Sequence, residues 1–392
     1  LPNELLVLRF CCVYFFVMKE NIFSGRFKAN EIFKDERALY PEFLPEKLPH
    51  REKEIDAIAF CFKPVLSGKK PVNAVVLGSP GTGKTVSAKF VLSQLEEISG
   101  RAKSLYINCF EFNSRNSVLS LIANFVGAAI PRRGLASDEI YSKMVDYLKK
   151  CGFIPIIVFD EADQLLLKEE GSKLLYDLLR IIESGKIRLG LIFISNNFDL
   201  TSSLDSRVKS SLSEESIVFE KYSPEQLKDI LKERASIAFF EDALEKDVIN
   251  VAAAHSAKLG GDARTGIESL LKAGRLAEKE NASKVSVVHL KKAFAVMDSA
   301  VLSKTFPFLL EQEKAILELI SFSDGIFSGN LFDEYSKAKN HLELRQFRAV
   351  ISKLESMNLI SAPLLEVKPR GKSRFISLKV PKDSLQKFFA KK

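Results

Sequence analysis

Short apolar runs recur along the first half of the chain at lengths typical of strands. They lie at residues 73–77, 104–108, 155–159 and 189–195. The run at 155–159 is apolar at every position, as expected for a strand buried on both faces of a parallel sheet. These runs therefore predict strands of a parallel sheet.

Amphipathic segments fill the intervals between these runs. Ile55, Ile58 and Phe62 recur at the spacing of one helix face, and residues 85–98 and 117–130 have the same period. Strands that alternate with helices predict an α/β fold, in which helices cover a parallel sheet.

The pattern changes after Leu212. Residues 224–239, 242–256, 263–280 and 287–297 all have helical spacing, and no run among them favours a strand. We therefore expect a separate, all-α unit.

A third pattern begins near Ser303, where three helical stretches precede two β-like runs at 359–367 and 374–380. The two runs predict a hairpin. The expected division of the chain is an N-terminal segment at 1–30, an α/β core at 31–215, a helical unit at 216–300 and a hairpin-bearing unit at 301–392.

The apolar start of the chain, residues 1–17, is interrupted by Arg9. It is shorter than the ~20 residues that a membrane-spanning helix needs. We interpret this stretch as the product of an upstream start codon, outside the working fold. A buried N-terminal strand is the alternative.

Charge and cysteine content narrow the class of protein. The 392 residues carry a formal net charge of +8, which favours a polyanionic partner, either nucleic acid or an anionic membrane surface. The five cysteines form no CxxC pair and there are only four histidines, which argues against a zinc site. Scattered cysteines suit a reducing cytoplasm.

A glycine-rich loop follows the run at 73–77 and opens the helix at 85–98. It has the spacing GxxxxGK[ST] and consists of Gly78, Ser79, Pro80, Gly81, Thr82, Gly83, Lys84 and Thr85. The glycines let successive backbone N–H groups turn toward one phosphate chain, at the positive end of a helix dipole. We expect Lys84 to reach the β- and γ-phosphates and Thr85 to coordinate Mg²⁺. The loop predicts nucleoside triphosphate binding; a plain glycine-rich turn is the alternative.

Two acids end the run at 155–159. Asp160 is expected to hold Mg²⁺ through water, and Glu161 to polarise the attacking water, because hydrolysis needs an oriented nucleophile. By itself the pair could be an exposed, acidic strand end.

Two further residues are candidates for contacts with the γ-phosphate. Asn196 ends the run at 189–195 and could orient water, although asparagine also caps strand ends. Arg264 follows Gly261, Asp262 and Ala263 at the start of a helix in the all-α unit. It could couple nucleotide state to the angle between the units; a solvated helix start is the alternative.

The order of these motifs resembles that of the AAA+ ATPases. Within them it resembles the archaeal origin-recognition, or cell-division-control type, replication initiators, from roughly Ile32 to Val380. The resemblance implies an α/β AAA+ core with a parallel sheet, an all-α lid and a C-terminal winged helix. It implies ATP or ADP with Mg²⁺ as the bound cofactors and slow hydrolysis that acts as a switch. It also implies three partners: double-stranded origin DNA, the replicative helicase, and other initiator subunits that supply or receive an arginine finger. A cytoplasmic, nucleoid-associated protein with no membrane partner is expected.

The same resemblance gives roles to residues that patterns alone do not single out. His50 and Arg51 lie in a segment like the one that packs against the adenine in this family. Arg207 matches the finger that contacts a neighbour's nucleotide, and Tyr222 and Arg234 match residues that touch the nucleotide. Without the family, Arg207 is a solvated arginine, Tyr222 a hinge-packing aromatic and Arg234 a surface residue.

Basic residues near the C-terminus have the layout of a winged helix. The segment 341–358 carries Arg345, Gln346, Arg348 and Lys353 on its polar face, and the hairpin tip carries Arg370, Lys372 and Arg374. The helix would enter the major groove and the wing would contact backbone or minor groove. Arg132 and Arg133 interrupt the core where this family inserts an element that presses on the minor groove. Solvated basic faces, or a protein-binding winged helix, are the alternatives.

The leading hypothesis is an ATP-dependent replication initiator that binds origin duplex and helps recruit or load the helicase. One rival is a winged-helix AAA+ ATPase in transcription control, plasmid partition or mobile-element maintenance. A protein-remodelling machine is another, but the sequence between the first two nucleotide motifs carries no aromatic pore-loop signature.

Overall fold

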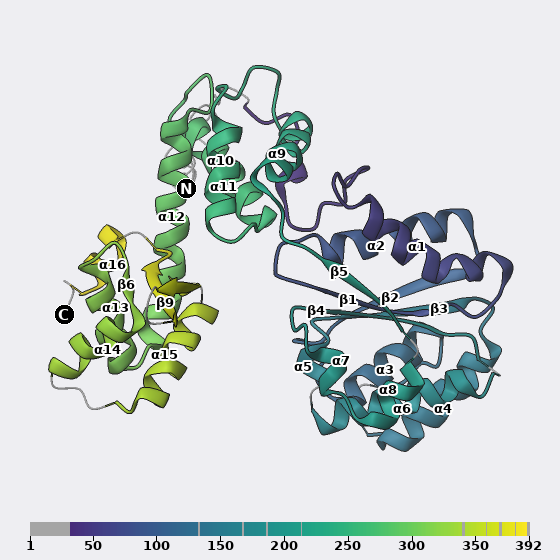
Figure 1. Cartoon of the computed structure of the whole chain (residues 1–392). Coiled ribbons are helices and arrows are strands. Elements are labelled where there is room, and N and C mark those ends of the chain that lie inside the picture. The colour runs from purple at the N-terminus through teal and green to yellow at the C-terminus, as the bar shows by residue number, and fades with distance from the viewer. Residues whose placement is uncertain are drawn as a thin grey trace, which may run out of the picture.

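The computed structural model describes residues 32–131, 134–166, 168–185, 187–212, 214–338, 342–357, 359–367, 371–380 and 382–389. The expected N-terminal segment at 1–30 lies outside these residues. The described chain forms an α/β unit, a helical unit and a C-terminal unit of helices with a small sheet (Figure 1). This confirms the predicted fold class.

Five parallel strands form the sheet of the α/β unit in the order β2-β3-β4-β1-β5. Their bounds are β1 Asn73–Gly78, β2 Ala102–Asn108, β3 Ile154–Asp160, β4 Gly190–Ser195 and β5 Glu214–Phe219. Asn108 pairs with Asp160, and Gly78 pairs with Phe219. The carboxyl ends of all five strands therefore meet at one edge, which holds the glycine-rich loop.

The first four strands match the four predicted runs, but β5 was not predicted. This strand lies at the edge of the sheet, and only Ile217 and Phe219 in it are buried. Its first three residues, Glu214, Glu215 and Ser216, are polar, so its apolar run covers only three positions.

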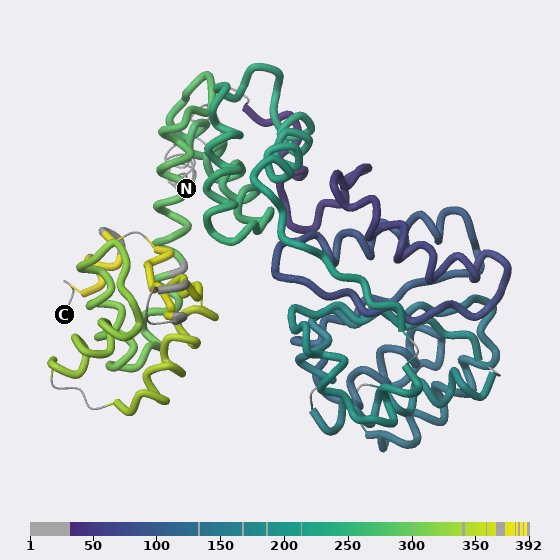
Figure 2. Tube along the Cα trace, viewed as in Figure 1, coloured from purple at the N-terminus to yellow at the C-terminus, as the bar shows by residue number. Residues whose placement is uncertain are grey.

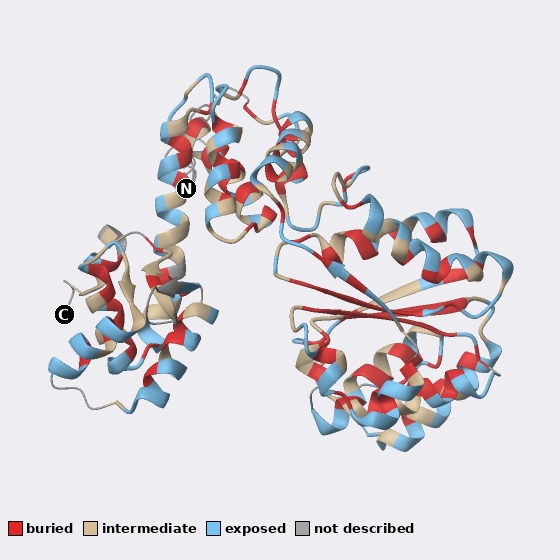
Figure 3. Cartoon of the chain, viewed as in Figure 1, coloured by how far each residue is buried: buried red, intermediate tan, exposed pale blue. Residues whose placement is uncertain are grey.

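Helices cover both faces of the sheet (Figures 1 and 3). On one face, α1 (Glu52–Phe62) and α2 (Lys84–Ile98) pack with Ile58, Phe62 and Leu92 against the strands. The other face is covered by α3 (Arg115–Phe125), α4 (Ser137–Lys150), α6 (Glu169–Glu183) and α8 (Ser206–Leu212). Short elements connect them: η2 (Lys63–Ser67), α5 (Asp163–Leu166) and α7 (Leu200–Ser203).

The helix expected at 117–130 is shorter in the structure. It begins at Arg115, where the Ser114 side chain accepts the backbone N–H of Ser117, and it ends at Phe125. Gly127 then has φ 93° and Ala129 has φ 47°, values that break a right-handed helix. The apolar spacing continues past the helix because Ile130 is buried in the following loop.

The helical unit contains four helices at the predicted places: α9 (Pro224–Ala238), α10 (Val248–Lys258), α11 (Ala263–Lys279) and α12 (Val287–Thr305). However, α10 begins at Val248 rather than at 242, and α12 ends at Thr305 rather than at 297. Ser223 caps α9 with Pro224 at its first position, as the sequence predicts. The last helix, α12, continues into the C-terminal unit (Figure 2). Leu290 lies in the helical core and Leu302 in the C-terminal core, so the expected boundary at 300 falls inside one helix.

Residues 32–39 pack in the helical unit, although the expected division assigned them to the α/β core. Ile32 and Leu39 are buried in the core of the helical unit. Phe33 forms a β-bridge with Phe239 and stacks on its ring at 4.9 Å between centroids. The stretch ends in the short helix η1 (Glu36–Leu39). Its partners are about 200 residues away in the chain, which local periodicity cannot reveal.

The C-terminal unit combines helices with a small antiparallel sheet. Strand β9 (Gly371–Leu378) pairs with β8 (Leu364–Val367) in the expected hairpin. It also pairs with β6 (Ile326–Phe327) and β7 (Ile360–Ser361). The helices are α13 (Glu311–Ser321), α14 (Ser328–Lys337), α15 (Leu344–Ser356) and α16 (Lys382–Phe389), with η3 (Phe306–Phe308) before them. This arrangement of helices and hairpin is a winged helix.

Among the described residues, no helix combines the length and apolar character required to span a bilayer.

Candidate functional site

The glycine-rich loop lies between β1 and α2 at the carboxyl edge of the sheet. Gly81 has φ 72° and Gly83 has φ 93°, a region that strongly favours glycine. A Cβ on Gly81 would lie 1.7 Å from Asp262 Oδ1, and one on Gly83 would lie 2.7 Å from Tyr222 Oη. Both glycines are thus required by backbone conformation and by the close approach of residues from the helical unit.

Lys84 is buried beneath this loop. Its Nζ donates to the carbonyl oxygens of Gly78 and Ser79, both at 2.9 Å, and to Asn196 Oδ1 at 2.8 Å. Burial lowers the pKa of Lys84 to about 8 because it disfavours the ammonium, although the nearby Glu161 carboxylate partly opposes this shift.

Side chains from the start of α2 and from the ends of β3 and β4 meet beside Lys84. Thr85 Oγ1 donates to Asp160 Oδ2 at 2.9 Å, and Asn196 Nδ2 donates to Glu161 Oε2 at 2.7 Å. Glu161 has φ 53°, and its pKa is raised by burial and then by the negative charge of Asp160. The structure thus brings the predicted residues of all three motifs into one hydrogen-bonded group.

A cavity of about 850 Å³ opens over this group. Its size suits a nucleotide-sized ligand. The predicted residues that line it are Pro80, Gly81, Gly83, Lys84, Thr85, Asp160, Glu161, Asn196, Tyr222, Arg234 and Arg264. The cavity therefore has walls from both the α/β core and the helical unit.

Phe43 and Leu44, which belong to the segment that the family resemblance places against the adenine, also line the cavity. Three lining residues were not singled out from the sequence: Tyr40 before the core, Lys89 of α2 and Arg275 of α11. The apolar part of this wall offers a surface for a flat ring. Without the resemblance, the only signal for the first segment is its proline-rich character, which indicates an extended chain but not its position.

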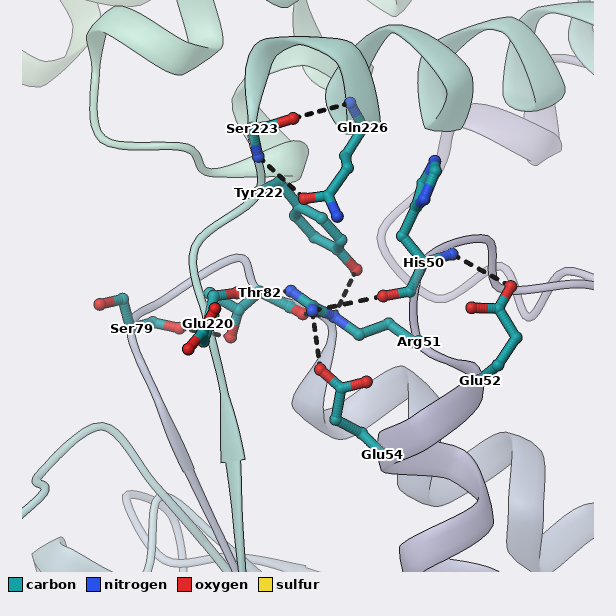
Figure 4. Close-up of polar contacts among 10 residues, drawn as sticks. All are labelled: His50, Arg51, Glu52, Glu54, Ser79, Thr82, Glu220, Tyr222, Ser223 and Gln226. Carbon is teal, nitrogen blue, oxygen red and sulfur yellow. Dashed lines mark hydrogen bonds and ion pairs between the residues drawn. The ribbon is translucent and has the colours of Figure 1, made fainter.

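Arg51 is not among the described residues that line the cavity. Figure 4 shows its guanidinium directed toward Thr82 and Tyr222. Arg51 is 3% exposed, and its guanidinium lies 3.9 Å from the centre of the Tyr222 ring. Its Nε donates to the carbonyl oxygen of Thr82 at 2.8 Å and to Tyr222 Oη at 3.1 Å. Its other nitrogens reach the Glu220 carbonyl and the Glu54 carboxylate. Arg51 thus joins the phosphate loop to the strand that leads into the helical unit.

His50 is also absent from the described residues that line the cavity. Its Nε2 lies 3.1 Å from Asp229 Oδ2 on α9. His50 and Arg51, which the family resemblance assigned to the nucleotide, therefore contact protein groups in this structure.

Arg234 lines the cavity from α9 and is 9% exposed. Its Nη1 donates to the Ala38 carbonyl at 3.1 Å, and its guanidinium lies 4.9 Å from the centre of the Phe43 ring. Burial lowers its pKa. The interpretation of Arg234 as a surface residue, drawn from the sequence alone, is wrong because the segment before the core folds over it.

Two other candidate arginines are exposed and paired with nearby acids. Arg264 lines the cavity and pairs with Asp262 at 3.2 Å. Arg207 pairs with Asp205 at 3.2 Å and does not line this cavity. An arginine that acts on a neighbouring protein's nucleotide must be exposed in this way.

Five of the predicted DNA-contacting residues have described side chains, and these fall into two groups. Arg345, Gln346 and Arg348 are exposed on α15. By contrast, Lys353 pairs with the buried Glu313 at 2.6 Å, and Arg374 pairs with Glu355 at 3.4 Å.

The remaining four predicted contacts lie wholly or partly outside the described residues. Arg132, Arg133 and Arg370 lie outside the described residues, and of Lys372 only the backbone, paired with Glu366, is described.

Family models and known proteins match this architecture. A model of the AAA domain matches residues 69–204, and one of the Cdc6 AAA+ ATPase-type lid domain matches residues 228–295. The chain is 34% identical over 371 residues to the ORC1-type DNA replication protein of Desulfurococcus amylolyticus, covering 91% of the chain and 93% of that protein. It is 36% identical over 379 residues to its Thermococcus kodakarensis counterpart, covering 92% and 91%.

Solved structures have the same arrangement. The Aeropyrum pernix ORC1 protein in complex with DNA has a TM-score of 0.69 and 32% identity, with 92% of this chain and 97% of that one covered. The Aeropyrum pernix ORC2 protein, solved in ADPNP–ADP complexes, has a TM-score of 0.69 at 24% identity, with 92% and 100% covered. The second match shows a shared fold.

Proposed function

The chain belongs to the ORC1-type DNA replication proteins, which makes it a replication initiator, and we propose that ATP operates it as a switch on origin DNA. The observation that carries this proposal is the shared cavity. Lys84 of the core and Arg264 of the helical lid both line it. A triphosphate held between them would fix the angle between core and lid, whereas a diphosphate would lack the group that both residues contact.

Each residue of the nucleotide site would have its own role. Lys84 would pair with the β- and γ-phosphates, Glu161 would orient the attacking water, and Asn196 would hold Glu161 in position. The Thr85 hydroxyl and the Asp160 carboxylate, already 2.9 Å apart, are hard oxygen donors that fit Mg²⁺. When bound, Mg²⁺ would neutralise phosphate charge. Arg207 would act on the nucleotide of a neighbouring initiator subunit, so hydrolysis by a single chain should be slow.

The winged helix would contact origin duplex chiefly through α15. Arg345 and Arg348 are exposed, and no ion pair is recorded for either among the described residues. They are therefore better placed for DNA than Lys353 and Arg374, whose charges already have acidic partners. The related Aeropyrum ORC1 protein was solved with DNA. The DNA-bound initiator, associated with the nucleoid, would then recruit or help load the replicative helicase.

Chromatin immunoprecipitation with sequencing tests the proposed DNA target. The wild-type protein should be enriched at a replication origin, and Arg345→Ala/Arg348→Ala should lose those peaks because two exposed charges on α15 are gone. Lys304→Ala/Lys337→Ala removes two charges from the same region without touching α15, and it should retain the peaks. Peaks spread over promoters would instead favour transcription control.

Because the pKa of Lys84 is lowered to about 8, we expect ATP affinity to fall as pH rises above that value. In the free protein its pKa is lowered to about 8, and bound phosphates would raise it again because they favour the ammonium. Well below pH 8 the lysine is already charged, so its affinity contribution does not vary. Above pH 8 binding must take up a proton, and affinity should fall by up to tenfold per pH unit.

Calorimetric titration at pH 9 in two buffers of different ionisation enthalpy would detect this proton uptake. Lys84→Arg stays charged at pH 9 and should bind without proton uptake. An equal heat of binding in the two buffers for the wild-type protein would contradict the role of Lys84.

A further inference from the structure

A second cavity lies at the opposite edge of the sheet from the glycine-rich loop. Its volume is about 390 Å³. Its lining includes Gly68 before β1, Arg101 before β2, Phe153 before β3 and Arg188 before β4. Because the strands are parallel, the loops that precede them gather at one edge, and that edge faces away from the nucleotide site.

Two guanidinium groups converge on Gly68 in this cavity. Gly68 has φ 66°, and a Cβ built there would lie 3.4 Å from Arg188 Nη1 and 3.5 Å from Arg101 Nη1. Arg188 donates to the Gly68 carbonyl, and Arg101 donates to the Leu66 carbonyl at 3.4 Å. A guanidinium has five N–H groups, so each arginine keeps further donors for a ligand.

The positive charge of this cavity is not balanced by its walls. The described residues that line it include Arg101, Arg188 and Lys149 and no aspartate or glutamate. The positive charge of Lys149 is already accounted for, because it lies in the last turn of α4 and pairs with Asp146 at 3.4 Å. Arg101 and Arg188 lie outside helices, and no ion pair is recorded for either among the described residues. Two adjacent like charges repel each other, and an anion between them removes that repulsion.

We propose that this cavity is an anion site that takes phosphate groups, separate from the triphosphate site. The planar fork of arginine matches phosphate oxygens in a bidentate way, and two forks suit a ligand with several negative charges. The volume is within the range of small-molecule sites. Phe153 adds an aromatic wall, with Lys103 Nζ 4.9 Å from its ring centre. The phosphates could belong to a free polyphosphate or to a nucleic-acid backbone.

Binding of inorganic tripolyphosphate to the full chain tests this site. The measurement uses Lys84→Ala as the background, so that the glycine-rich loop contributes little. Isothermal titration should still detect one site. Adding Arg101→Gln/Arg188→Gln should weaken it at least about tenfold, because charge-assisted hydrogen bonds are lost.

Two matched pairs of variants serve as controls. Lys143→Gln/Arg180→Gln also removes two positive charges from the α/β unit, but at positions outside the cavity. It should leave the affinity for tripolyphosphate nearly unchanged. Arg101→Lys/Arg188→Lys keeps the charge without the fork and should bind measurably more weakly than arginine does. If the glutamine pair fails to fold, as judged by thermal unfolding, the lysine pair decides the question.

A duplex oligonucleotide then identifies the source of the phosphates. If the duplex displaces tripolyphosphate from the Lys84→Ala protein, the site takes backbone phosphates; if it does not, the ligand is a free polyphosphate. Either result supports a phosphate site. The proposal is overturned if Lys84→Ala binds no tripolyphosphate, if the control pair weakens binding as much as the arginine pair, or if the lysine pair binds like the wild type.

Discussion

Glu161→Gln should bind ATP almost as tightly as the wild-type protein and should lose nearly all hydrolysis. Glutamine keeps the size of the side chain and an oxygen that can accept from Asn196 Nδ2, which donates to Glu161 at 2.7 Å. It cannot act as a carboxylate toward the attacking water. A positioned acid–base group contributes about 10²–10⁴-fold, so turnover should fall by at least about 10²-fold.

The direction of the Glu161 pKa adds a second expectation for the wild-type protein. Burial and the neighbouring Asp160 raise the pKa, so the carboxylate is lost at a higher pH than for an ordinary glutamate. Hydrolysis should therefore decline as pH falls through that raised pKa, and this decline should be missing from the residual activity of Glu161→Gln.

Single-turnover hydrolysis and equilibrium binding of labelled ATP measure the two effects separately. Glu169→Gln, at the exposed start of α6, is the control and should leave both quantities unchanged. Normal hydrolysis by Glu161→Gln would remove this residue from its role.

Arg51→Ala should destabilise the nucleotide-binding unit by about 3 kcal/mol, because it leaves the Glu54 carboxylate and two backbone carbonyls without their buried partner. ATP affinity should fall with it, since the Thr82 carbonyl in the phosphate loop loses its donor. Arg51 makes no contact with the cavity, so any effect on ATP would act through the position of the loop and the lid.

Calorimetric unfolding of the full chain measures this stability, using the transition that shifts when nucleotide is added. Tyr222→Phe removes only the hydroxyl that accepts from Arg51 Nε and should cost about 1 kcal/mol. Arg51→Lys keeps the charge but cannot reach several acceptors at once, so its effect should lie between the two. An Arg51→Ala protein with unchanged unfolding and unchanged ATP affinity would contradict the proposed link.

The local pattern of apolar residues was sufficient to predict most strands of the sheet and the helices of the lid. Three of the four predicted runs became β1, β3 and β4, whose residues are almost all buried, and the fourth became β2, an edge strand in which only Ala102 and Ile107 are buried. The four lid helices followed from their period and from the cap at Ser223. The edge strand β5 was not predicted because its first half, Glu214 to Ser216, is polar. The predicted α3 was too long because the apolar spacing continues into the loop that follows it.

The sequence by itself determined which residues form the candidate nucleotide site, because Lys84, Thr85, Asp160 and Glu161 belong to contiguous motifs that follow strands, and parallel strands bring such segments together. Only the tertiary structure decided what surrounds them. In the structure, residues 32–39 pack in the lid and Arg234 is buried under that segment. Arg51 contacts the phosphate loop at the Thr82 carbonyl, and Arg101 lies beside Arg188. Each of these contacts joins residues far apart in the chain. The reason is physical: motifs encode local backbone geometry, whereas the partner of a lone arginine depends on which distant surfaces become buried together.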